Sequence, residues 1–156
     1  MNESAGRDPW ASVTAIPFGR ELGIALVSAS EAGCVLRLPY RAELVGNTDN
    51  GALHVGALFS LADSAFGLAV LRKAGAARGF ATLDLRIDHL RRSGSGRDAF
   101  CEADCYKVTR DLAFVRGVLH EGDPATPLAT AVGIFVFTGV GMPDGRRVDR
   151  RGGASA

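Results

Sequence analysis

The sequence has few cysteines, and they follow no recognisable pairing pattern. Cys34, Cys101 and Cys105 form no C-x-x-C pair and have no histidine at the spacing of metal ligands. Zinc sites and disulfide frameworks depend on such spacings. We therefore expect no metal ion and no disulfide, and we interpret the three cysteines as small buried apolar residues.

A strong charge of either sign is also missing. The formal net charge is +1, so no overall field attracts nucleic acid or an anionic membrane. The first ten residues show no export signal, and Ser60, Asp63 and Ser64 interrupt the longest apolar stretch, which argues against a membrane span. We expect a cytoplasmic protein that binds a small molecule or another protein.

Repeats and long linkers are absent as well. The chain has 156 residues, of which 47% are hydrophobic, enough for one domain with a substantial core. Residues 1–8 and 141–156 are rich in Gly, Ser, Arg and Asp, so we expect flexible ends. The remaining segment, 9–140, is predicted to be a single domain.

What the sequence does contain is one long apolar helix. Residues 55–73 are apolar or small at nearly every position, with Arg72 and Lys73 at the end and Gly75 beyond. Cations in the last turn and a following glycine are typical of a helix C-terminus. A helix that is apolar on all sides must be covered by other structure.

Strand patterns surround this helix. Residues 82–88 alternate strictly, which predicts that Leu83, Leu85 and Ile87 face the core. Further strands are expected at 24–27, 34–38, 99–109, 112–120 and 128–138, and a short helix within 9–22. An α+β fold, with an antiparallel sheet curled around one long helix, satisfies both patterns.

Asp63 is a lone carboxylate within this apolar helix. Such a group is rarely buried without a partner. At about 100° per residue, Gly56, Ser60, Asp63 and Gly67 lie along one stripe. Small residues beside one acid predict a cleft with a single charge in it. The alternative is a stripe that packs against another subunit, with Asp63 merely hydrogen-bonded.

The segment His54-Val-Gly-Ala-Leu-Phe-Ser-Leu-Ala-Asp63-Ser-Ala-Phe resembles a motif of the hotdog-fold acyl-CoA thioesterases. It is most similar to the phenylacetate-pathway (PaaI-like) branch of the 4-hydroxybenzoyl-CoA thioesterase superfamily. There the pattern is His-Gly-Gly, an apolar stretch and Leu-Ala-Asp, with the acid nine residues after the histidine. The resemblance spans roughly residues 18–138 and implies a hotdog fold.

The resemblance also implies roles for individual residues. Asp63 would be the nucleophile or the general base for water, and the backbone N–H of Val55 would polarise the thioester carbonyl. His54 and Asn47 would shape the site, and Thr82, contributed by the neighbouring subunit, would hold water. Val55 departs from the motif, which has glycine there, but its N–H can serve while its branched side chain narrows the pocket.

Further residues are candidates for substrate binding. The pocket is expected to be lined by Gly56, Phe59, Ser60, Phe66 and Gly67. Among the basic residues, Arg91 and Arg92 are the candidates for contacts with the phosphates of coenzyme A. Coenzyme A is part of the substrate, so no separate cofactor is expected.

The predicted function is hydrolysis of acyl-CoA by a homodimer or homotetramer, because in related proteins a second subunit completes the site. The lack of a G-x-S-x-G elbow argues against a serine hydrolase. A non-catalytic acyl-CoA binding or sensing module is one alternative, motivated by Val55. A hotdog hydratase or dehydratase acting on enoyl or hydroxyacyl thioesters is the other.

Overall fold

The computed structural model describes residues 16–31, 33–75 and 78–139. The predicted flexible ends, the start of the predicted helix 9–22 and both limits of the predicted domain lie outside these residues. The helices are α2 (Pro17–Leu22), the 3-10 helix η1 (Ala42–Leu44) and α3 (Val55–Ala74), and the strands are β1 (Ala25–Ser30), β2 (Gly33–Leu38), β3 (Val45–Asn47), β4 (Ala52–Leu53), β5 (Phe80–His89), β6 (Ala99–Val108), β7 (Leu112–His120) and β8 (Ala129–Phe137).

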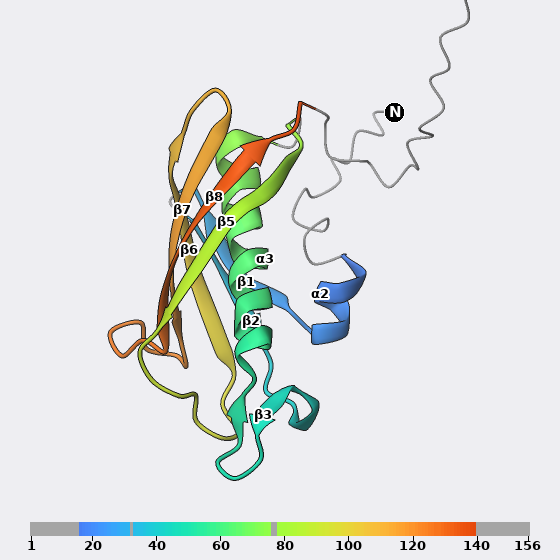
Figure 1. Cartoon of the computed structure of the whole chain (residues 1–156), viewed down its shortest axis with the longest axis vertical. Coiled ribbons are helices and arrows are strands. Elements are labelled where there is room, and N and C mark those ends of the chain that lie inside the picture. Colours follow the sequence, from blue (N-terminus) through green and yellow to red (C-terminus); the bar gives the residue numbers. More distant parts are fainter. Residues whose placement is uncertain (1–15, 32, 76–77, 140–156) are drawn as a thin grey trace, which may run out of the picture.

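Six strands form one antiparallel sheet in the order β1-β2-β6-β7-β8-β5. The sheet curves around α3, while α2 lies beside the helix and the short hairpin β3-β4 lies at its N-terminal end (Figure 1). The α+β hotdog architecture predicted from the sequence, with a short N-terminal helix, is confirmed.

The ends of α3 follow from local chemistry. His54 is the N-cap, and its Nδ1 accepts a hydrogen bond from the Gly56 N–H at 2.9 Å. Arg72 and Lys73 occupy the last turn, and Gly75 ends the helix with a φ of 82°, a conformation that glycine adopts readily. Both predicted ends of the helix are therefore close to the observed ones.

By length and composition alone, α3 would qualify as a membrane span. Ser60, Asp63 and Ser64 therefore do not by themselves argue against a membrane span, in contrast to the interpretation of the sequence. The most apolar window of α3 is, however, 56% buried inside the fold. The sheet covers most of the helix, as expected of the core helix of a globular domain.

Phe66 is a core residue, so the prediction that it lines the substrate pocket is wrong. The side chain is fully buried, and its ring fills a hollow left by two glycines of adjacent strands. A Cβ at Gly117 would lie 2.5 Å from Phe66 Cε1, and one at Gly133 would lie 2.8 Å from Cδ2. Larger residues at either position would collide with the ring.

A β-bulge interrupts the predicted alternation in β5. Thr82 pairs with Phe135 and Asp84 pairs with Ile134, so Leu83 is an extra residue between two consecutive pairs. Leu83 is 61% exposed rather than in the core, whereas Leu85 and Ile87 pack against the core. Because directly paired residues share one face of a sheet, Thr82 lies on the helix side with the buried Phe135.

Candidate functional site

A pocket of about 300 Å³ surrounds Asp63. Four elements form it: α2 and the residue before it, the exposed stripe of α3, the start of β5, and β8. The lining residues are Ile16, Phe18, Gly19, Phe59, Ser60, Asp63, Ser64, Gly67, Phe80, Ala81, Thr82 and Phe135. Of the predicted stripe, Ser60, Asp63 and Gly67 line the pocket and Gly56 does not, so the cleft beside the acid exists.

Asp63 faces this pocket and is only partly buried. The Thr82 hydroxyl donates a hydrogen bond to Asp63 Oδ1 at 2.8 Å. Within residues 16–31, 33–75 and 78–139, no other donor binds this carboxylate, so Oδ2 is free to accept a proton or a hydrogen bond from a ligand. A carboxylate with one oxygen fixed by a hydrogen bond and the other oxygen free is the arrangement expected of a general base or a nucleophile.

Thr82 reaches Asp63 within the same chain, and not across a subunit interface as expected from the resemblance. The cause is the bulge at Leu83. Strict alternation with Leu83, Leu85 and Ile87 inward would turn Thr82 away from the helix. The extra residue lets Thr82 and Leu85 face the same side.

A second reactive feature lies at the N-terminus of α3. The Gly56 N–H is used by the His54 cap, and the His54 N–H donates to the Leu44 carbonyl at 2.7 Å. The Val55 N–H, the first of the helix, has no acceptor among the described residues. Free N–H groups at a helix N-terminus bind anions and developing oxyanions.

His54 and Asn47 both belong to this end of the helix. Gly46 of β3 lies so close to His54 that a Cβ would be 2.8 Å from the His54 Cα, which places β3 beside the cap. The Asn47 Oδ1 accepts a hydrogen bond from the Asp49 N–H at 3.0 Å in the β3-β4 turn. Within the described chain both side chains therefore have local structural partners.

The two reactive features are too far apart to act on one carbonyl within a single chain. Val55 and Asp63 are eight residues apart on a continuous helix, which is about 12 Å along its axis. An attacking group and an oxyanion donor must both lie about 3 Å from the reacting atoms. In one chain, the Val55 amide and the Asp63 carboxylate therefore lie at two separate places on α3.

Arg91 is not a free cation, in contrast to its predicted role with phosphates. Its NH1 lies 2.8 Å from Oε2 of the almost fully buried Glu121, and its NH2 donates to the Thr126 carbonyl at 2.8 Å. These contacts hold the loop that follows β5. Arg92 is exposed, and neither arginine lines the Asp63 pocket.

The cysteines are buried, as predicted. Burial raises the pKa of the Cys34 thiol to about 12, although the nearby Arg72 acts in the opposite direction. Burial also raises the pKa values of Cys101 and Cys105. Since the thiolate is the reactive form, none of the three is suited to be the nucleophile.

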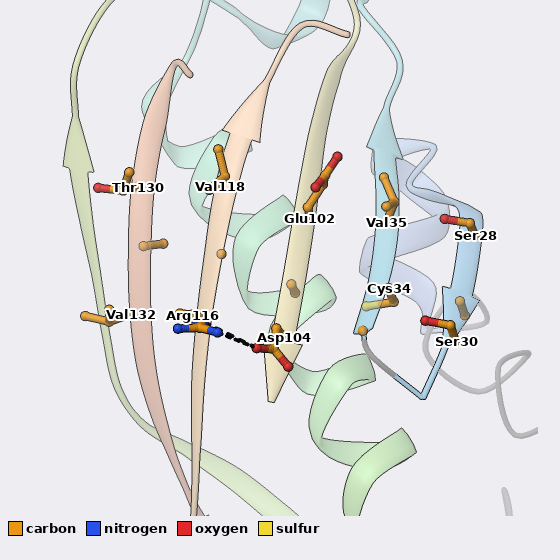
Figure 2. A pocket seen from close by; sticks show the side chains of 15 residues that line it. Ser28, Ser30, Cys34, Val35, Glu102, Asp104, Arg116, Val118, Thr130 and Val132 are labelled. Atoms are coloured by element: carbon orange, nitrogen blue, oxygen red, sulfur yellow. Dashed lines mark hydrogen bonds and ion pairs between the residues drawn. The ribbon is translucent and has the colours of Figure 1, made fainter. Parts of the chain in front are cut away.

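A larger depression of about 640 Å³ lies on the opposite face of the sheet. Figure 2 shows Asp104 and Arg116 side by side among its lining residues, paired across β6 and β7, with 3.1 Å between Arg116 Nη2 and Asp104 Oδ2. Their charges largely neutralise each other. The depression contains neither Asp63 nor the helix N-terminus, so the smaller pocket is the better candidate for chemistry.

Sequence reasoning missed more than half of the residues that line the pocket. Ile16 and Phe18 come from the segment around α2, and Phe80 and Phe135 come from paired strands. The two strand phenylalanines are 55 residues apart in the chain. Only the pairing of β5 with β8 brings their rings together, and hydrophobic periodicity carries no information on that pairing.

Comparison with known proteins identifies clear relatives. A family model described as "Thioesterase superfamily" matches residues 50–128. A solved structure from Pseudomonas aeruginosa is 33% identical, with a TM-score of 0.73 over 82% of this chain and 98% of that chain. The phenylacetic acid degradation protein PaaI of Thermus thermophilus is 27% identical, with a TM-score of 0.67 over 77% of this chain and 97% of that one.

The PaaI protein of Escherichia coli, from the phenylacetic acid degradation operon, is similar in fold. It is 22% identical, with a TM-score of 0.74 over 84% of this chain and 91% of that chain. No match was found among curated proteins.

Proposed function

Because the chain belongs to the thioesterase superfamily, we propose that it hydrolyses acyl-CoA thioesters to free coenzyme A and a carboxylic acid. The observation that carries this proposal is the Asp63 carboxylate, which lines a pocket with one oxygen held by Thr82 and the other free. No separate cofactor is required, because coenzyme A is part of the substrate.

In the general-base form of the reaction, Asp63 takes a proton from water as the water oxygen attacks the thioester carbon. The C–S bond then breaks, and the thiolate of coenzyme A receives a proton. In the nucleophilic form, Asp63 attacks the thioester carbon, the C–S bond breaks to release the thiolate of coenzyme A, and water then hydrolyses the resulting anhydride to the carboxylic acid and free Asp63. A thiol with an ordinary pKa of about 8.5 is a good leaving group, so neither form needs a strong general acid.

The Val55 N–H is the proposed donor to the carbonyl oxygen. It is the free amide of the helix N-terminus, where the helix dipole also favours negative charge. Val55 is 56% exposed, so this end of the helix faces solvent in the single chain.

We further propose a homodimer in which Asp63 of one copy and the Val55 amide of the other act on the same thioester. The separation of about 12 Å along the helix within one chain supports this division. So does the uncovered stripe of α3, where Val55 and Phe59 are 56% and 45% exposed. Strand β5 is a ten-residue edge strand with an exposed Leu83, and such edges are usually covered in assemblies.

The direct test is release of thiol from a panel of aryl, short-chain and long-chain acyl-CoAs by the purified protein. We expect thiol and carboxylic acid in equal amounts. A binding or sensing module would instead bind acyl-CoA tightly and release no thiol. Hydration of an enoyl-CoA without thiol release would favour the hydratase and contradict the proposal.

Complementation between two inactive variants tests the shared site. Asp63→Asn removes the proposed base or nucleophile, and Val55→Pro removes the proposed oxyanion donor. In a mixed dimer, one of the two sites has both intact halves. Random exchange at equal amounts is therefore expected to restore about a quarter of the wild-type activity.

Each variant incubated alone is the control for subunit exchange, and co-purification of the untagged variant with an affinity-tagged partner variant confirms that mixed dimers form. If both halves belonged to the same chain, every site in the mixture would retain a defect. Activity that stays at the level of the separate variants, although mixed dimers have formed, would contradict the shared site.

A further inference from the structure

Gly67 and Phe80 lie opposite each other in the wall of the Asp63 pocket. Gly67 lies one helical turn after Asp63, on the same stripe of α3. A Cβ at Gly67 would lie 3.6 Å from Phe80 Cε2, which is ordinary van der Waals contact. The glycine therefore leaves a gap about one methyl group wide between the helix and the ring.

Phe80 is held in position by a second ring. It packs edge-to-face on Phe135, with 5.8 Å between the ring centroids and an interplanar angle of 79°. Phe135 is only 2% exposed and belongs to the strand paired with β5. Because Phe135 is fixed in the core, Phe80 forms a firm part of the pocket wall.

The pocket lining has little polar side-chain surface besides Asp63, since its other polar side chains are the hydroxyls of Ser60, Ser64 and Thr82. Among the residues that line the pocket, Asp63 is the one charged side chain. The hydroxyl of Thr82 is directed to Asp63 and that of Ser60 donates to the Gly56 carbonyl, while Gly67, Phe80 and Phe135 contribute apolar surface. A charged acyl terminus would lose its hydration there without a countercharge.

We propose that Gly67 and Phe80 form a subsite that limits the length of an uncharged, apolar acyl group. The chain runs from the thioester beside Asp63 over Gly67 and ends against Phe80. Gly67 provides the passage and Phe80 the stop. This proposal rests on the proposed function, because it takes acyl-CoA as the ligand.

The variant Gly67→Ala tests the passage. Alanine favours a helix more than glycine does, and the added Cβ meets Phe80 at an acceptable distance, so we expect no loss of thermal stability. For straight-chain acyl-CoAs at the length limit of the wild type, kcat/KM should fall about 10-fold or more. Acetyl-CoA, whose acyl group is too short to reach Gly67, is the internal control, and its kcat/KM should fall less than that of the longest accepted chains.

The variant Phe80→Leu tests the stop. It keeps an apolar side chain but replaces the ring with a smaller group, so Phe80→Leu should accept longer acyl chains than the wild type. Gly67→Ala, in contrast, should accept only shorter acyl chains than the wild type. Opposite shifts of the two limits are the expected result. An unchanged chain-length profile in folded Gly67→Ala would overturn the subsite.

Binding measurements separate this proposal from the reaction itself. Calorimetric titration of the Asp63→Asn protein with acyl-CoAs of increasing length reports the subsite without turnover. Affinity should rise about fourfold per methylene up to a limit, and adding Gly67→Ala should shorten that limit. If the limit shifts but wild-type protein releases no thiol, the subsite stands and the hydrolase proposal fails. If the wild-type protein releases thiol but Gly67→Ala does not shift the length limit, the hydrolase proposal stands and the subsite proposal fails.

Discussion

Replacing Asp63 with asparagine is expected to lower kcat for thioester hydrolysis about 10³-fold, the range of a lost general base. Asparagine has the same shape and can still accept the hydrogen bond from Thr82 through its Oδ1, so the pocket keeps its outline. It cannot take a proton from water or form an anhydride. KM should change little, and a thiol-release assay with a saturating substrate measures the loss.

The matched control is Asp111→Asn. Asp111 lies in the turn between β6 and β7, and its side chain is 78% exposed, so the same chemical change there should leave kcat unaltered. Equal melting temperatures for the two variants and the wild type would show that the fold is intact. Wild-type turnover by folded Asp63→Asn would remove this residue from the mechanism.

The second large effect is expected from Val55→Pro, which deletes one N–H group. Proline is well tolerated at the first position of a helix, and His54, with φ −62° and ψ 135°, already has the backbone conformation that precedes proline. The helix should therefore form as before. Loss of one oxyanion donor lowers kcat about 10²- to 10³-fold, measured in the same thiol-release assay.

Val55→Ala is the control, because it shortens the side chain while keeping the N–H. It should retain activity close to that of the wild type, and Val55→Gly, which restores the residue of the motif, should do so as well. If Val55→Pro and Val55→Ala lost activity equally, the side chain and not the amide would matter. The proposed oxyanion donor would then be wrong.

Local sequence signals predicted most of the fold. The apolar run with Arg72, Lys73 and Gly75 at its end gave the limits of α3 closely, since helix ends depend on neighbouring residues. Strand β7 was predicted at its observed ends, 112–120. The hairpin β3-β4 was missed, because its two strands have only three and two residues, too few for an alternating pattern.

The candidate site was predictable only where one element determines it. The stripe of Ser60, Asp63 and Gly67 depends on helix geometry alone, and the pocket follows it. Phe66 is only three residues from Asp63, yet its environment is set by glycines on two strands more than fifty residues later. Arg91 likewise appeared free because its partner, Glu121, is distant in the chain.

The bulge in β5 has a consequence for how this chain should be compared with its relatives. Leu83 is supernumerary: without it, Thr82 would still face α3 and Asp84 would still face away. A relative that lacks the extra residue would match this chain only with a gap in the middle of a strand, where gaps are normally penalised most. An ungapped alignment would pair Thr82 with a residue of the wrong face, and the hydroxyl that binds Asp63 would seem to be missing from the relative when it is present.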